Sequence, residues 1–243
     1  FDGLVVSDQD SILDAWNGSR RHPGHFYGHS QENVSALAIR AGCDQNDGVT
    51  YAKSLAGAIS RDLVATSDID TALTRVLMQR FRVGAFDPPQ LCPFRSIGTA
   101  VMDSPAHRAL ALEAARKGVV LLCNTDAALP LDAGDAHATT VAVIGPLAND
   151  TTSLAGGKPD YHPSFTISHL QGIQARMARF GGAPTYAAGC EGVAKCSQGA
   201  IKLATHAAAA ATTTIIFVGI DGSIEREGTD RTSIGLPPTQ LDM

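Results

Sequence analysis

The sequence predicts an α/β protein built around mainly parallel strands, and two observations support this prediction. Helical and β-rich segments alternate along the second half of the chain, which is the order that βαβ units produce. The β-rich runs are apolar throughout instead of alternating between apolar and polar residues, which is typical of parallel strands that helices cover on both faces. With 243 residues, the chain could form one large domain or two small ones.

In the first part of the chain, the pattern predicts a short strand followed by helices. Residues 4–7 form an apolar β-rich run that ends at Asp8, and residues 42–44 could form a second, very short strand. Apolar residues at helical spacing predict three helices, with Ser67 or Asp68 as the N-cap of the last. These helices are expected over 31–41, 51–61 and 68–83.

Glycine and proline punctuate the chain after these helices. They mark residues 86–105 as a linker between a first domain, 1–85, and a second domain, 106–243. In the second domain, helical and β-rich segments are expected to alternate. The predicted helices are 105–117, 168–180 and 197–211, and the predicted strands are 119–122, 140–144, 184–187 and 212–220.

Composition narrows the class of protein. Hydrophobic residues make up 44% of the chain and charged residues 18%, which are ordinary values for a globular protein and exclude a mainly disordered one. The net charge of −5 argues against broad nucleic-acid binding, because that needs a basic face. The sequence contains no apolar run of about 20 residues, so we expect no membrane-spanning helix.

The five cysteines form no Cys-x-x-Cys pair, which weakens the case for a structural zinc site. Cys190 and Cys196 flank a short polar loop and could form a local disulfide. Acceptor sequences for N-glycosylation begin at Asn17, Asn33 and Asn149. Taken with a disulfide, these sequences favour a secreted protein.

Asp8 is the first candidate for chemistry. It comes directly after an apolar strand, at the carboxyl edge where α/β proteins place functional side chains. The alternative is an aspartate that only caps the following turn or helix. Position alone leaves both interpretations open.

The segment 219–231 is the second candidate, because it follows the longest β-rich run and crowds charged residues into one loop. These charged residues are Asp221, Glu225, Arg226, Glu227, Asp230 and Arg231. Neighbouring carboxylates and guanidinium groups can separate the pKa of one carboxyl from that of another, and glycoside hydrolysis needs two carboxyl groups that differ in this way. The alternative is a solvated charged loop.

A loop rich in glycine and histidine is the third candidate. It contains His22, His25 and His29, whose spacing matches no standard zinc pattern, so we expect no metal site there. The loop either faces a substrate beside Asp8 or is a plain surface loop.

Four segments, in this order and at this spacing, form a pattern that no single one of them carries. They are DGLVVSD at 2–8, FRVGAFD at 81–87, ALEAARKGVVLL at 111–122 followed by LPL at 129–131 and VAVIGPLA at 141–148, and GID at 219–221 followed by IEREGTDR at 224–231 and LP at 236–237. With this pattern along nearly its whole length, the chain resembles glycoside hydrolase family 3, specifically its β-xylosidase and α-arabinofuranosidase branch.

The resemblance implies a fold in two parts. Residues 1–85 would be the last βα units of a (β/α)8-like barrel, residues 86–105 the linker, and residues 106–243 an α/β sandwich domain with a mainly parallel sheet. Both parts would be incomplete, because a whole barrel needs about 250 residues and both ends of the chain fall inside predicted elements.

The resemblance also implies roles for residues. Asp8 matches the nucleophile and Glu227 matches the general acid/base, with Glu225 as the alternative. The candidates for substrate binding are Arg231, Asp230, His25 and Tyr27. No metal and no organic cofactor is implied.

The implied function is that of a retaining exo-glycosidase, which would release terminal β-linked xylose from oligosaccharides through a covalent glycosyl-enzyme. The alternatives are a β-glucosidase or an α-L-arabinofuranosidase of the same family, or a non-catalytic carbohydrate-binding relative. Two departures bear on the xylose preference more than on the reaction type: Gln9 stands where many relatives have cysteine, and residues 43–48 lack their Cys-Gly pair. The chain alone is expected to hydrolyse little, since most sugar-binding groups would lie on strands that it lacks.

Overall fold

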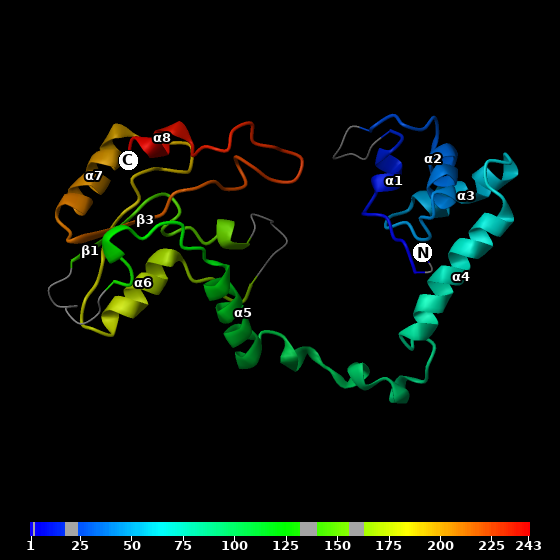
Figure 1. The fold of residues 1–243 in the computed structure, drawn as a ribbon, viewed down its shortest axis with the longest axis horizontal. Coiled ribbons are helices and arrows are strands. Elements are labelled where there is room, and N and C mark those ends of the chain that lie inside the picture. The colour runs from blue at the N-terminus through cyan, green and yellow to red at the C-terminus, as the bar shows by residue number, and fades with distance from the viewer. Residues whose placement is uncertain (2, 18–23, 132–139, 156–162) are drawn as a thin grey trace. The chain divides into compact units, whose positions relative to one another are not determined.

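The computed structural model describes residues 1, 3–17, 24–131, 140–155 and 163–243 (Figure 1). These residues form two compact units, Phe1–Ser104 and Pro105–Met243, which are described separately below. The division falls at the end of the predicted linker. None of the helices that the structure describes is long and apolar enough to span a bilayer.

The first unit is held together by helices. They are α1 (Ser11–Asp14), α2 (Gln31–Arg40), α3 (Thr50–Ser60) and α4 (Thr66–Arg82). The core lies where α2, α3 and α4 meet, and its buried residues are Ala36, Ile39, Ala58, Val64 and Ala72. Inside the contact between α2 and α3, the hydroxyls of Ser35 and Ser54 are 2.7 Å apart, so each of these two buried groups has a partner.

The start of α4 differs from the sequence prediction. Neither Ser67 nor Asp68 is the N-cap, because the helix already begins at Thr66. Asp68 lies in the first turn, where its carboxylate accepts a hydrogen bond of 3.1 Å from the N–H of Ala65. An acidic side chain in the first turn also stabilises a helix, as an N-cap does, because the N-terminal N–H groups lack partners within the helix.

The predicted strands at 4–7 and 42–44 reduce to one parallel bridge between Val6 and Gln45. The N–H of Ser7 donates to the carbonyl of Gln45 at 2.9 Å, and the N–H of Asp44 donates to the carbonyl of Val5 at 2.9 Å. Because α2 lies between the two segments in the chain, this is the connection of a βαβ unit. A pair of strands is only marginally stable without further strands, which accounts for the short ladder.

Residues 86–104 run as a largely exposed segment with three short 3-10 turns. The turns are η1 (Pro89–Leu91), η2 (Pro93–Ser96) and η3 (Thr99–Val101). Proline opens the first two turns, where its missing N–H costs no hydrogen bond.

The second unit contains a three-stranded parallel sheet in the order β2-β1-β3. Its strands are β1 (Val141–Ile144), β2 (Thr185–Ala187) and β3 (Thr213–Ile216), and its two main helices are α6 (His169–Ala178) and α7 (Gln198–Ala209). Every residue of the central strand β1 is buried. Val141 and Val143 pack with Leu170 of α6, whereas Ala142 and Ile144 pack with Ala204 of α7.

The two helices therefore cover opposite faces of the sheet, as Figure 1 shows for α6 and α7. The topology explains this arrangement. The chain moves from β1 to β2 through α6, and then returns past β1 to β3 through α7. Since parallel crossovers are right-handed, reversing the direction of travel places the second helix on the other face. The predicted α/β class with a parallel sheet is confirmed for this unit.

Serine caps the main helices of the second unit. The hydroxyls of Ser168 and Ser197 accept hydrogen bonds from the N–H groups of Gln171 and Ala200, at 3.2 and 3.3 Å. In turn, the N–H of Ser168 donates a hydrogen bond of 2.9 Å to the side-chain oxygen of Gln171, which completes a capping box at the start of α6.

The end of β1 is fixed by Gly145. Its φ is +111°, and a Cβ built there would lie 2.1 Å from the carbonyl oxygen of Phe217. Glycine alone fits such a position, because any side chain would collide with the backbone that follows β3. β3 ends at Ile216, directly before Phe217, although the β-rich run predicted a strand over 212–220.

The predicted strand at 119–122 is wrong in this structure. The segment follows α5 (Pro105–Gly118), none of whose residues is buried. Val119 is 80% exposed and Leu122 is 92% exposed, and the segment pairs with no strand of the described chain. An apolar run becomes a strand only where a neighbour offers hydrogen bonds, and sequence pattern cannot report that neighbour. The remaining elements are η4 (Thr125–Ala127), η5 (Ser153–Ala155) and α8 (Pro238–Leu241).

Candidate active site

Asp8 lies at the carboxyl end of the segment that pairs with Gln45, directly before α1, and it is exposed. Its carboxylate accepts a hydrogen bond of 2.7 Å from the N–H of Gln9. Its carbonyl accepts from the hydroxyl of Ser11 at 3.0 Å, which ties the backbone at Asp8 to the first turn of α1. The side chain of Asp8 thus stands at the surface of the first unit on an ordered backbone.

Asp44 anchors the start of this segment, and the sequence analysis did not single it out as a site residue. Its carboxylate accepts hydrogen bonds from the N–H of Val5 and from the guanidinium of Arg75 on α4, each at 3.0 Å. The side chain of Asp44 is only 2% exposed. The one available signal was its position as the last residue of the predicted short strand 42–44, which is the next predicted strand after that of Asp8.

Ser7 anchors the other end of the segment. Its hydroxyl accepts hydrogen bonds from the N–H of Asp47 at 3.0 Å and from the side-chain amide of Asn46 at 3.2 Å. Tyr51 holds the same neighbouring stretch, since its hydroxyl donates to the carbonyl of Cys43 at 2.9 Å. Burial raises the pKa of Tyr51, and the hydrogen bond to Cys43 raises it further, so this phenol stays a donor.

His25 and Tyr27 follow α1 and are both exposed. The N–H of His25 donates to the carbonyl of Asp14 at 2.7 Å, and the N–H of Tyr27 donates to that of Ala15 at 2.8 Å. Their loop therefore folds back against the end of the helix that Asp8 precedes. His22 lies outside the described residues, and within those residues no group of three or more His, Cys, Asp and Glu side chains is placed to hold a metal ion.

In the second unit, loop 219–231 leaves the carboxyl end of the sheet and is ordered by its own contacts. The carboxylate of Asp221 accepts hydrogen bonds from the N–H of Ser223 at 2.8 Å and from its hydroxyl at 2.5 Å. The guanidinium of Arg226 donates to the carbonyl of Gly222 at 2.7 Å. These contacts join the first half of the loop to the second.

Glu227 lies at the tip of a tight turn in this loop and is exposed. The backbones of Arg226 and Thr229 exchange two hydrogen bonds, of 3.0 and 2.9 Å, across the turn. Gly228 completes the turn with a φ of +75°, a conformation that glycine adopts without strain. The turn therefore presents the side chain of Glu227 at an exposed tip on a defined backbone.

Glu225 and Arg231 form an ion pair, with 2.9 Å between a carboxylate oxygen of Glu225 and Nε of Arg231. This pair closes the base of the turn that carries Glu227. Asp230, next to Arg231, is exposed. Four predicted residues, Glu225, Glu227, Asp230 and Arg231, thus lie in one loop of the second unit, whereas Asp8, His25 and Tyr27 belong to the first unit.

An open pocket of about 500 Å³ lies at the carboxyl edge of the sheet, where the loops after the three strands meet. Its lining residues are Pro146, Leu147, Asp150, Thr152, Ser153, Gly192, Val193, Asp221, Gly222 and Ser223. This edge is where open α/β sheets bind ligands. Burial raises the pKa of Asp150, but hydrogen bonds from Ser153 and Thr152 outweigh it and hold that pKa below its ordinary range.

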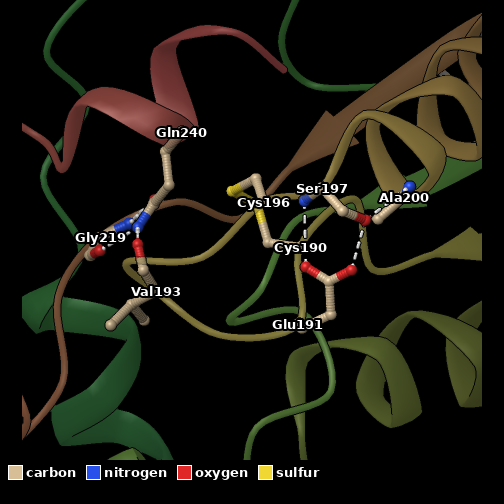
Figure 2. The surroundings of a disulfide bond; sticks show 8 residues. All are labelled: Cys190, Glu191, Val193, Cys196, Ser197, Ala200, Gly219 and Gln240. Carbon is tan, nitrogen blue, oxygen red and sulfur yellow. Dashed lines mark hydrogen bonds between the residues drawn. A yellow bond between two sulfur atoms is a disulfide. The ribbon is translucent and has the colours of Figure 1, made fainter.

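The predicted disulfide between Cys190 and Cys196 is present and closes the loop between β2 and α7 (Figure 2). Inside this loop, Glu191 accepts hydrogen bonds from both the N–H and the hydroxyl of Ser197, the N-cap of α7. These bonds lower the pKa of Glu191. Gln240 of α8 reaches the same loop and the start of loop 219–231, a set of contacts that the sequence analysis missed.

Comparison with known proteins gives a consistent picture. The family model described as "Glycosyl hydrolase family 3 C-terminal domain" matches residues 119–243. "Beta-D-xylosidase 1" of Arabidopsis thaliana is 38% identical over all of this chain, which covers 30% of that protein. "Probable exo-1,4-beta-xylosidase bxlB" of Aspergillus terreus is 36% identical over 90% of this chain and 27% of its own length.

Solved structures share the arrangement. The chain matches a structure titled "GH3 exo-beta-xylosidase (XlnD) in complex with xylobiose aziridine activity based probe" with a TM-score of 0.81 and 33% identity, over 99% of this chain and 29% of that one. A β-glucosidase from Listeria innocua in complex with isofagomine shares the fold, with a TM-score of 0.78 and 20% identity over 99% of this chain and 31% of that one. The chain spans about 30% of the length of the curated relatives that it matches.

Proposed function

The chain belongs to glycosyl hydrolase family 3, and we propose that its protein is a retaining exo-glycosidase that releases terminal β-linked xylose from xylo-oligosaccharides. The relatives at 38% and 36% identity are named as xylosidases. The solved relative at 33% identity is in complex with a xylobiose aziridine probe. These names support xylose as the sugar, ahead of the glucose or arabinose that the sequence left open.

We further propose that the first unit contributes the last βα units of a (β/α)8-like barrel. The support is the parallel bridge between Val6 and Gln45 with α2 between them, which is one βαβ connection. In such a barrel the residue after a strand faces the catalytic end. Asp8 occupies that position.

The observation that carries the mechanism is the turn that presents Glu227. Its tip is exposed and its backbone is fixed by the exchange of hydrogen bonds between Arg226 and Thr229. Glu225, the alternative acid/base, pairs with Arg231 at 2.9 Å at the base of the turn. We assign the acid/base role to Glu227, because it lies at the exposed tip and its position before Gly228 matches the acid/base of the family.

In the proposed reaction, a carboxylate oxygen of Asp8 attacks the anomeric carbon while the bond to the leaving oxygen breaks. Glu227 gives its proton to that oxygen. Glu227 then takes a proton from water as the water attacks the anomeric carbon, which releases xylose with its β configuration and frees Asp8. Retaining enzymes hold two such carboxyl groups about 5–5.5 Å apart. The chemistry needs no metal or organic cofactor.

We assign substrate contacts to His25 and Tyr27 of the first unit and to Asp230 and Arg231 of the second. All four are exposed. Tyr27 offers an aromatic face and the other three offer polar groups for sugar hydroxyls.

We also propose that the protein acts outside the cell, because the disulfide between Cys190 and Cys196 is of a kind that persists in oxidising compartments.

The test is a set of three variants in the full-length protein: Asp8→Asn, Glu227→Gln and Glu225→Gln. Asp8→Asn is expected to lower kcat on an aryl β-xyloside by several orders of magnitude, because the covalent step loses its nucleophile. Glu227→Gln should lower kcat about 10²- to 10⁴-fold on a substrate whose leaving group needs a proton. Glu225→Gln should have the smaller effect of a loosened turn.

Parallel assays with aryl β-glucoside and aryl α-L-arabinofuranoside decide the sugar, and the β-xyloside is expected to give the highest kcat/KM. Unchanged activity of Asp8→Asn would remove Asp8 from the mechanism. If Glu225→Gln loses more activity than Glu227→Gln, the two roles must be exchanged. The 243-residue chain alone serves as a further sample, in which we expect little turnover.

A further inference from the structure

Gln240 is a buried polar residue that joins two loops at the carboxyl edge of the sheet. It lies on α8 and is 4% exposed. Its carbonyl oxygen Oε1 accepts a hydrogen bond of 2.9 Å from the N–H of Gly219, and its Nε2 donates to the carbonyl of the same residue at 2.8 Å. Nε2 also donates to the carbonyl of Val193. Figure 2 shows the side chain directed at both residues.

Each of these two partners begins or lies within a constrained loop. Gly219 is the first residue of loop 219–231, and its φ is +155°. Val193 lies within the loop that the disulfide between Cys190 and Cys196 closes. Val193 also lines the 500 Å³ pocket with residues 221–223. The side chain of Gln240 therefore binds to two of the loops that line this pocket.

A continuous series of contacts leads from Gly219 to the tip of the loop. The carbonyl of Asp221 accepts from the N–H groups of Ile224 and Glu225, at 3.0 and 3.2 Å. Arg226 then reaches back to the carbonyl of Gly222. The turn at Glu227 follows at once, with the ion pair between Glu225 and Arg231 at its base. A short path of hydrogen bonds therefore joins Gly219 to the turn that carries Glu227.

We propose that Gln240 is a positioning residue for Glu227: its side-chain amide fixes the start of loop 219–231 against the disulfide-closed loop, and this sets where Glu227 delivers its proton. The inference rests on the acid/base role proposed above for Glu227. Only a carboxamide meets the demand of this site, because the site offers one N–H that needs an acceptor and two carbonyls that need donors. A carboxylate has no donor when ionised, and an apolar side chain has neither group.

The first experiment asks whether Gln240 holds the loop, and it uses the full-length protein. Trypsin cleaves after Arg226 and Arg231, which are both exposed within the loop. Gln240→Met removes all three hydrogen bonds at nearly constant volume, and we expect cleavage at these two sites to become about tenfold faster. Leu241→Ala is the matched control, since Leu241 lies on the same helix and is 70% exposed.

The second experiment asks whether the loop position acts through Glu227, and it uses the full-length protein. A leaving group such as dinitrophenol departs without a proton, whereas an alkyl alcohol needs one. If Gln240 positions the acid, Gln240→Met lowers kcat/KM, which reports the step that forms the glycosyl-enzyme, about tenfold more on an alkyl β-xyloside than on dinitrophenyl β-xyloside. Both substrates are measured on one preparation, so a smaller folded fraction cancels in the ratio. Gln240→Glu, which keeps only the acceptor, should shift the ratio in the same direction.

The outcomes separate the inference from the proposed function. Equal trypsin cleavage in Gln240→Met and the wild type, or an equal fall of kcat/KM on both substrates, would overturn the positioning role. Glu227→Gln is measured beside them as the reference for a lost acid. If Glu227→Gln itself leaves the ratio of the two substrates unchanged, the acid/base assignment fails and the positioning role fails with it. If Glu227→Gln shifts the ratio and Gln240→Met does not, only the inference about Gln240 is wrong.

Discussion

Asp44 and Glu32 each pair with an arginine in the first unit, but they differ in burial. Asp44 is 2% exposed and meets Arg75 at 3.0 Å, whereas Glu32 meets Arg61 at 3.4 Å with the arginine 62% exposed. A buried charge needs its partners to offset the cost of removing it from water. An ion pair at the surface, in contrast, contributes at most about 1 kcal/mol to stability. The segment that carries Asp8 thus depends on Asp44 and little on Glu32.

Replacing Asp44 tests this dependence. We expect Asp44→Ala to lower the free energy of unfolding of the first unit by about 3 kcal/mol, because the N–H of Val5 and the guanidinium of Arg75 both lose their acceptor. Asp44→Asn should cost less, since its carbonyl still accepts from Val5. The measurement is urea unfolding followed by the fluorescence of Trp16, the single tryptophan, which lies in the first unit.

Glu32→Gln is the matched control for the Asp44 variants. It should change the free energy of unfolding by less than about 1 kcal/mol, as expected for a solvated pair. An Asp44→Ala variant as stable as the Glu32→Gln control would mean that the strand of Asp8 is held by other contacts.

Residues differ in how far the sequence reveals them. Asp8 stands out because it directly follows an apolar run, and Glu227 because it lies in a charge-rich loop after the longest β-rich run. Asp44 and Gln240 do not, because their partners are backbone groups that lie 39 residues away at Val5 and 47 residues away at Val193. Only the fold brings such groups together, so a local pattern could mark the position of Asp44 at the end of a short predicted strand but could not predict these partners. The assignment of Asp8 and Glu227 to catalysis stays a prediction.

At the scale of elements, helices were predicted more closely than strands. A helix makes its hydrogen bonds within itself, so apolar spacing and a serine cap locate it, as for α2, α6 and α7. A strand needs a partner. Within the run at 140–144, β1 pairs with two strands, whereas the equally apolar run at 119–122 pairs with no strand of the described chain.

The N-terminus of α7 should respond to pH through Glu191. Hydrogen bonds from Ser197 hold the pKa of Glu191 below its ordinary value of 4.5 in the folded protein. A lowered pKa in the folded state stabilises the fold above the ordinary value, and this contribution disappears as the pH falls through the folded pKa. The stability difference between the wild type and Glu191→Gln should therefore be present at neutral pH and absent well below 4.5.

Urea unfolding of both proteins, followed by circular dichroism across this pH range, measures the difference. Gln198→Ala, an exposed and uncharged neighbour, is the control and should show no change of its effect with pH. A Glu191→Gln effect that is constant from neutral to acidic pH would show that the ionised carboxylate contributes nothing through Ser197.

At the scale of the whole molecule, the exposed apolar segment 119–122 is a liability for the chain in solution. Four consecutive apolar side chains are each at least 63% exposed. Unpaired apolar segments of this kind promote association between copies. We expect Val120→Lys with Leu122→Lys to raise the concentration at which the chain stays monomeric by light scattering.

The same double variant should leave the free energy of unfolding nearly unchanged, because Val120 and Leu122 are 72% and 92% exposed. Its counterpart is Val143→Lys, which places a charge at a position with no exposed surface and should unfold the second unit. A large loss of stability in the double variant would mean that the segment packs against the protein in solution.

The glycine that ends β1 has a consequence for how freely this sequence can vary. The backbone carbonyl of Phe217 occupies the space where a side chain at position 145 would begin. The backbone at Phe217 is held by a hydrogen bond of 2.8 Å to the carbonyl of Ile144, so it cannot move aside as a flexible side chain can. Of the twenty amino acids, a randomised codon at Gly145 should yield folded protein with glycine alone. At Gly172, nothing lies within 4 Å of a new Cβ. The same experiment should therefore yield folded protein with many different amino acids there, and alanine should be favoured.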